Sequence, residues 1–211
     1  MKQLPKLPAD VHPGVVQNPS PLLNPARKAL TITWDTWAKL TETEQAVADK
    51  RRFAPVAQQA AERALSAADK ALSVLAESRT AVGKKIAAVV CPPTPDPLAA
   101  EIRAHFKAQP KGAGLFGTLG GFITKGDRRT CAAIFNAPAY LSGLTDEQHA
   151  TLIDIARRQW CPEDVAAMEA MTDAAGRVKR AVDFITSNLA PFVKEWTRDA
   201  DAKALEGLKN A

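Results

Sequence analysis

The sequence has few aromatic residues, few cysteines and no long hydrophobic segment. Aromatic residues make up 6% of its 211 positions, and its three cysteines, Cys91, Cys131 and Cys161, stand far apart. An odd number of distant cysteines supports neither a disulfide framework nor a metal-binding knuckle, so we expect reduced thiols. No apolar run approaches the ~18–20 residues that span a bilayer, and residues 1–10 lack the apolar segment of a secretory signal. We therefore expect synthesis in the cytoplasm and no contact with a membrane.

Alanine is abundant instead, at 40 of 211 residues, while 46% of positions are hydrophobic and 24% are charged. These proportions are typical of a folded globular chain and exclude a disordered one. Alanine is the strongest helix former and fills little core volume. Its abundance therefore predicts an all-α fold in which long helices pack closely through small side chains.

The formal net charge is +5, and it is distributed unevenly along the chain. Residues 1–130 carry 19 basic and 11 acidic side chains, whereas residues 131–211 carry 9 and 12. A nucleic-acid-binding protein usually concentrates its basic residues on one element, often with stacking aromatics, but the arginine pairs here are scattered, at 51–52, 128–129 and 157–158. The opposite charges of the two parts favour self-association or a charged partner at least as well as DNA.

The N-terminal segment is rich in proline. Six of the fifteen prolines lie in the first 25 residues, where each lacks a backbone donor and disfavours helix in the residue before it. Apolar residues, rather than glycine and serine, separate these prolines, so the segment is not typical of a flexible linker. We predict an extended arm over residues 1–33 whose apolar side chains need a surface, on a partner or on the chain's own domain.

The residues that we expect to bind a partner lie in this arm and directly after it. Trp34 and Trp37 share a helix face at the root of the arm, where aromatic residues are often partner contacts, although core packing is the alternative for both. The predicted partner-binding residues are Leu4, Leu7, Val11, Val15, Val16, Leu22, Leu23, Trp34 and Trp37.

Residues 34–196 predict a single helical domain whose first element is a helix over 34–90. Apolar residues recur there every seven positions from Leu40 to Val89, including Ala54, Ala61, Ala68 and Leu75, and a second row joins them after residue 60. That second row consists of Leu65, Leu72, Arg79 and Ile86. Two such rows are typical of a seam along which one long helix packs on another.

A second seam lies in the helix predicted over residues 162–196. Its apolar residues alternate three and four positions apart, and Pro191 is expected to kink or end the regular helix. The row consists of Met168, Met171, Ala175, Val178, Val182, Ile185, Leu189, Phe192 and Trp196. The two seams predict long antiparallel helices in a hairpin or bundle, which can close within one chain or between subunits.

Shorter elements are predicted between the two long helices. Four prolines in residues 91–97 predict a linker, and residues 98–144 predict short helices with a glycine-rich loop or small hairpin at 110–126. Thr145-Asp-Glu-Gln148 predicts a capping box for a helix over 145–160. The polar tail, residues 197–211, is expected to fray.

No motif predicts an enzyme. Gly112 to Gly117 match G-x-G-x-x-G, but no strand is predicted before them, so a flexible or closely packed loop is expected rather than a nucleotide site. A catalytic thiol could pair His149 with Cys161 or His105 with Cys91, although buried cysteines are the simpler expectation. We therefore predict no catalytic, cofactor-binding or metal-binding residue.

The stretch from Phe135 to Gln148, FNAPAYLSGLTDEQ, is followed by a charged amphipathic helix and then by Pro162-Glu-Asp. This combination resembles small helical proteins from the head and connector modules of tailed bacteriophages and prophages. The resemblance implies a non-enzymatic structural or assembly protein of the virion, docking in multiple copies on portal, connector or capsid subunits. It also implies a homo-oligomer or ring, found in the host cytoplasm during assembly and then in the virion.

Two alternatives remain open. The first is a DNA-associated helical accessory, a packaging protein or an ejected internal protein, which would make weak non-specific DNA contacts. The second is a scaffolding factor that leaves the particle after assembly. Salt dependence distinguishes the first, because affinity that rests on phosphate contacts falls steeply as salt rises.

Overall fold

The computed structural model describes residues 3–48, 50–93, 96–110 and 112–209, with the side chains of all of these except 51, 113 and 198–209. Within these residues the secondary structure is helical and contains no strand, which confirms the all-α prediction. The chain divides into two compact units, unit 1 (residues 1–78 and 170–211) and unit 2 (residues 79–169). The prediction of one helical domain over residues 34–196 is therefore wrong, because both long helices contribute to both units.

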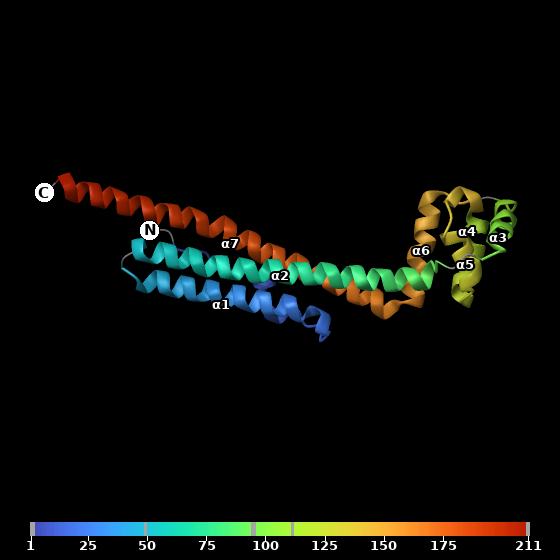
Figure 1. Ribbon diagram of the computed structural model, residues 1–211, viewed down its shortest axis with the longest axis horizontal. Helices are drawn as coiled ribbons and strands as arrows, with labels where there is room; N and C mark the ends of the chain where they lie inside the picture. The colour runs from blue at the N-terminus through green and yellow to red at the C-terminus, as the bar shows by residue number, and fades with distance from the viewer. Residues whose placement is uncertain (1–2, 49, 94–95, 111, 210–211) are drawn as a thin grey trace. The chain divides into compact units, whose positions relative to one another are not determined.

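Unit 1 contains a bundle of three helices: α1 (Asn24–Ala46), the first part of α2 (Lys50–Val90) and the last part of α7 (Pro162–Lys209). The three lie side by side in Figure 1, with α2 antiparallel to α1 and to α7. One core cluster draws on all of them, with Trp37 and Leu40 from α1, Phe53, Ala54, Ala57, Ala61 and Ala64 from α2, and Ile185, Leu189 and Trp196 from α7.

Alanine forms most of the buried face of α2 in unit 1. The buried positions alternate three and four residues apart, and we call the first six of them the alanine seam: Ala54, Ala57, Ala61, Ala64, Ala68 and Ala71, followed by Leu75. Ala54, Ala61, Ala68 and Leu75 of the first predicted row are therefore buried, whereas Leu65 and Leu72 of the second row are only half-buried. Methyl groups let helix axes approach closely, because the separation of packed helices depends on the side chains between them.

The helix predicted over residues 34–90 is in fact two helices. The first begins at Asn24, inside the predicted arm, because Pro25 stands in the first turn, where its missing N–H leaves no helical hydrogen bond unmade. The chain turns between Ala46 and Lys50, and an ion pair closes this turn. Lys50 Nζ lies 3.4 Å from Glu44 Oε1 and also donates to the main-chain carbonyl of Glu44.

The helix α7 extends farther than predicted. It runs through Pro191 and on to Lys209, so of the two effects predicted for Pro191, a kink or an end, the end does not occur. The prediction of a frayed tail from residue 197 is wrong for the described main chain. Ala174 and Ala181 are buried in place of Ala175 and Val182, which are half-buried.

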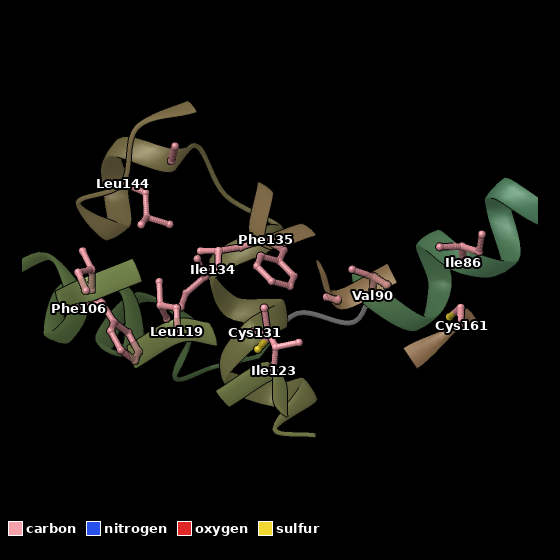
Figure 2. Close-up of a cluster of buried hydrophobic side chains, with 14 residues drawn as sticks. Ile86, Val90, Phe106, Leu119, Ile123, Cys131, Ile134, Phe135, Leu144 and Cys161 are labelled. Carbon is pink, nitrogen blue, oxygen red and sulfur yellow. The ribbon is translucent and has the colours of Figure 1, made fainter. Parts of the chain in front are cut away.

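Unit 2 consists of short helices around a core of its own. They are α3 (Ala99–Lys107), α4 (Ala113–Lys125), α5 (Arg128–Phe135) and α6 (Asp146–Trp160), joined by the end of α2 and the start of α7. Figure 2 shows side chains from these elements and from the loop before α6 meeting in one apolar cluster, among them Val90, Phe106, Ile123, Ile134 and the loop residue Leu144. At the start of α6, Thr145 and Gln148 form the predicted capping box, each side chain accepting from the other residue's backbone N–H.

The glycine-rich loop or hairpin predicted over residues 110–126 is instead the helix α4. Leu115, Leu119 and Ile123, four residues apart, are each at most 2% exposed. Burial of this apolar face outweighs the low helix propensity of glycine, because most helical stability in proteins comes from tertiary packing. Gly112 before the helix and Gly126 after it have φ of 109° and 75°, which are backbone angles that favour glycine.

Alanine in place of Gly117 is expected to raise the free energy of unfolding of unit 2 by about 0.5–1 kcal/mol. A Cβ atom at this exposed position of α4 would meet no heavy atom within 4 Å, so only the entropic cost of glycine is removed. Chemical denaturation followed by circular dichroism measures the change. Gly143→Ala is the matched control and should destabilise, because Gly143 has φ of +78° and its Cβ would lie 3.4 Å from Lys107 Cα. A neutral or destabilising G117A would contradict the expectation.

An ion pair joins the segment after α2 to α5. The Asp96 carboxylate accepts from the guanidinium of Arg129, with Nη2 3.1 Å from Oδ1, and from the backbone N–H of Leu98 at 2.8 Å. The hydrogen bond from Arg129, and after it the one from Leu98, lowers the pKa of Asp96 to about 2. Both contacts favour the ionised carboxylate, and protonation weakens them.

Stability from this ion pair is expected to depend on pH. Because the pKa of Asp96 is lower in the folded chain, its contribution is complete above about pH 4, the ordinary range of an aspartate, and is lost as the pH falls toward 2. The difference in urea midpoint between the natural chain and Asp96→Asn should therefore shrink between pH 5 and pH 2. Arg129→Gln should show the same trend, and a difference that stays constant over this range would refute the assignment.

Candidate partner-binding surface

The segment from Gln3 to Leu23, called the arm below, lies on the helices of unit 1. It has three short 3-10 turns, Ala9–Val11, Pro13–Val15 and Pro21–Leu23, and the second and third pack on α1. Arg177 and Arg180 of α7 contact Asp10, so the arm is in contact with two helices of the bundle. Of the two surfaces considered for it, the structure places the arm on the chain's own domain.

The predicted partner-binding residues of the arm differ in exposure. Leu4, Val11, Val16 and Leu23 are buried, Leu7 and Val15 are half-buried, and Leu22 is 36% exposed. Leu4 and Leu7 belong to the core cluster that includes Trp37. In the conformation described, most of the apolar surface of the arm is therefore already covered by unit 1.

Both predicted tryptophans contact the arm. Trp37 is 2% exposed, its Nε1 donates to the Pro5 carbonyl at 2.7 Å, and its ring meets Phe184 of α7 edge-on with 5.3 Å between centroids. Trp34 is half-buried, and the His12 ring stands edge-on to it at 4.7 Å. The structure thus brings Trp34 and Trp37 into contact with the arm and places Trp37 in the core, which is the alternative considered for it.

Polar contacts that the sequence did not predict fix the course of the arm. The guanidinium of Arg27 donates to the carbonyl oxygens of Val16, Asn18 and Ser20. Asp10 accepts from Arg180 Nε at 2.9 Å through its carboxylate and from Arg177 Nη1 at 2.8 Å through its main-chain oxygen. Contacts between residues about 170 positions apart leave no local pattern in the sequence. No sequence signal could therefore have predicted the contacts of Arg177 and Arg180 with Asp10.

Apolar burial holds the arm more strongly than these polar contacts do. Asp10 and Arg180 have side chains 50% and 51% exposed, and ion pairs so open to solvent contribute about 0–1 kcal/mol. Burying a valine or leucine side chain completely is worth about 1.5–3 kcal/mol, and Val11 and Leu23 are each only 2% exposed. The polar contacts therefore set the position of the arm, while its apolar side chains provide most of the affinity.

The histidines and cysteines have other neighbours than each other. In the described part of the chain no hydrogen bond joins His149 to Cys161 or His105 to Cys91; the ring of His149 lies 3.2 Å from the Ile134 carbonyl oxygen, and that of His105 lies 3.1 Å from Gln109 Nε2. Burial raises the pKa of Cys131 to about 12, which disfavours the reactive thiolate. Cys131 packs as an apolar residue in the core of unit 2.

Among the residues that the structure describes, no group of three or more His, Cys, Asp or Glu side chains could hold a metal ion. None of the helices, as far as they are described, is long and apolar enough to span a bilayer. No protein-family model, curated protein or solved structure matches the chain. Its class is therefore given by its architecture, which is all-helical, with two units and an N-terminal arm packed on its own bundle.

Proposed function

We propose that this chain is a non-enzymatic structural or assembly protein of a bacteriophage particle, docking in multiple copies on portal, connector or capsid subunits. The observation that carries the proposal is the arm, an apolar segment without long regular structure that is bound to a helical bundle through side-chain burial and a few hydrogen bonds. The resemblance of residues 135–148 to proteins of phage head and connector modules supports the same function.

In the proposed mechanism the arm of one copy binds to the bundle of a neighbouring copy. The contacts that Leu4, Val11 and Asp10 make with the bundle can be made equally by the arm of a second copy, so exchange conserves them and costs little. Prolines restrict the released segment to extended conformations, which limits the entropy that it gains when free. Repeated exchange would join copies around the symmetric parts of a particle.

The test compares the solution mass of the full chain with that of a chain lacking residues 1–23, by light scattering over a range of concentrations. We expect an oligomer for the full chain and a monomer for the shortened one. Leu4→Ser with Val11→Ser is a milder second variant. Lys6→Ser with Gln17→Ser, at two exposed arm residues outside the predicted partner-binding set, is the matched control that should still assemble. Circular dichroism verifies that each variant remains helical. An equal mass for all variants at every concentration would exclude assembly through the arm.

The DNA-associated accessory is the second candidate, because Lys28, Arg63 and Lys70 line a groove on unit 1. It predicts that affinity for duplex DNA falls by several orders of magnitude between about 50 and 200 mM salt. A scaffolding role predicts that the protein is present in immature particles and absent from mature ones, which mass spectrometry of purified particles would decide.

A further inference from the structure

Unit 1 has an open groove between α1 and α2, built only from residues of these two helices. Its volume is about 710 Å³, within the range of sites that bind ligands. The arm contributes none of the residues that line the groove, so the groove is separate from the surface on which the arm packs.

The floor of the groove is apolar and shallow. Ala29 of α1 and Ala71 of α2 are buried, and Ala67 and Ile32 are half-buried. Val74, at one end, is 44% exposed. Small floor residues allow a second backbone to approach closely, and Ile32 and Val74 offer apolar surface to its side chains.

The rim of the groove is cationic. Lys28, Arg63 and Lys70 belong to it, and none of them forms an ion pair among the described residues. The single acidic residue of the lining, Glu62, accepts a hydrogen bond from Gln58 Nε2, one turn earlier in α2, at 3.1 Å. Three cations and one anion around an apolar floor give the groove a positive character.

We propose that this groove binds an acidic amphipathic helix of a partner protein. Such a helix would place apolar residues, spaced three and four apart, on the floor, and its flanking carboxylates would meet the cationic rim. Arg63 and Lys70 lie seven residues apart on α2, which is two helical turns or about 10 Å. Glutamates seven residues apart on the partner helix would have the same spacing, so the two sets of charges match along the groove.

A nucleic acid fits these features less well. The lining residues include no aromatic side chain on which a base could stack, and the apolar floor has no counterpart on a phosphate backbone. The proposal is independent of arm exchange, because α2 contributes most of the groove and the arm contributes nothing to it.

The test uses two fluorescein-labelled helical peptides with the same leucine stripe, one flanked by glutamate and the other by lysine. Anisotropy titrations use the full chain at physiological salt. We expect the acidic peptide to bind at least tenfold more tightly than the basic one. The triple variant Lys28→Glu, Arg63→Glu, Lys70→Glu should reverse this preference, and Val74→Asp should weaken binding of the acidic peptide.

The matched control makes the same change of net charge elsewhere, with Lys84→Glu, Lys107→Glu and Lys179→Glu, at exposed lysines outside the groove lining. It should leave the preference for the acidic peptide intact, and circular dichroism verifies the fold of both triple variants. Equal binding of the two peptides, or equal effects of the two triple variants, would overturn the proposal. So would a duplex DNA probe that competes with the acidic peptide and loses its binding only in the groove variant, because the site would then belong to nucleic acid.

Discussion

Replacing Trp37 by alanine is expected to lower the free energy of unfolding of unit 1 by about 4 kcal/mol, the usual loss for a buried tryptophan. The side chain is 2% exposed, packs in the core cluster against α7, and donates its Nε1–H to the Pro5 carbonyl. The variant loses both the packing and the main fixed point of the arm's first residues. Urea denaturation followed by circular dichroism measures the change.

Two controls separate packing from the hydrogen bond. Trp37→Phe keeps an aromatic ring beside Phe184 but loses the donor and part of the indole volume. It should cost about 2 kcal/mol, less than W37A, from the unpaired Pro5 carbonyl and a small cavity. Trp34→Ala removes a half-buried ring and should cost less than W37A. If W37A and W34A were equally stable, Trp37 would not occupy the core position that the structure gives it.

Replacing Lys50 by methionine is expected to lower the free energy of unfolding by about 3 kcal/mol, toward the low end of the range for a broken buried ion pair. The Glu44 side chain is only 5% exposed, and Lys50, whose side chain is 18% exposed, is the cation that faces it across the turn between α1 and α2. Without Lys50 the carboxylate stays buried and loses the ion pair that the structure gives it. Urea denaturation followed by circular dichroism measures this change in the free energy of unfolding.

The double variant Glu44→Gln, Lys50→Met is the control for this expectation. It removes both charges at once, and replacement of a buried pair by uncharged residues is often close to neutral, so much of the lost stability should return. If the double variant were as unstable as K50M alone, the loss would come from the aliphatic stem of Lys50 or from its bond to the Glu44 carbonyl.

Local signals predicted some elements correctly. The all-helical fold follows from the alanine content and the apolar spacing, and the capping box at Thr145 depends on two residues three positions apart. Ala54, Ala61, Ala68 and Leu75 of the first row are buried because a seven-residue spacing keeps side chains on one face of a helix. These features depend on neighbours in the sequence, and the sequence shows them.

Other features depend on contacts between distant residues, which no local sequence pattern predicts. The turn between α1 and α2 contains neither glycine nor proline, and its closure requires Glu44 to be buried beside Lys50. The helix α4 forms in spite of its glycines because Leu115, Leu119 and Ile123 are buried in the core of unit 2. The arm residues were correctly recognised as apolar, but their burial depends on core residues distant in the sequence, such as Trp37 and Ile185. Their position also depends on Arg177 and Arg180, which lie far along the chain.

The alanine seam also leaves the position of α2 along its own axis weakly specified. Six of its positions carry the same methyl group, so a slip by seven residues would put alanine where alanine stood over most of its length. Uniform packing specifies a single arrangement poorly, and the distinctive residues lie at the ends, where Phe53 meets Trp196 with 5.2 Å between ring centroids and Leu75 is 1% exposed. The register of α2 is therefore set by its ends, and loss of the Phe53 ring would remove one of the contacts that define this register as well as leave a cavity.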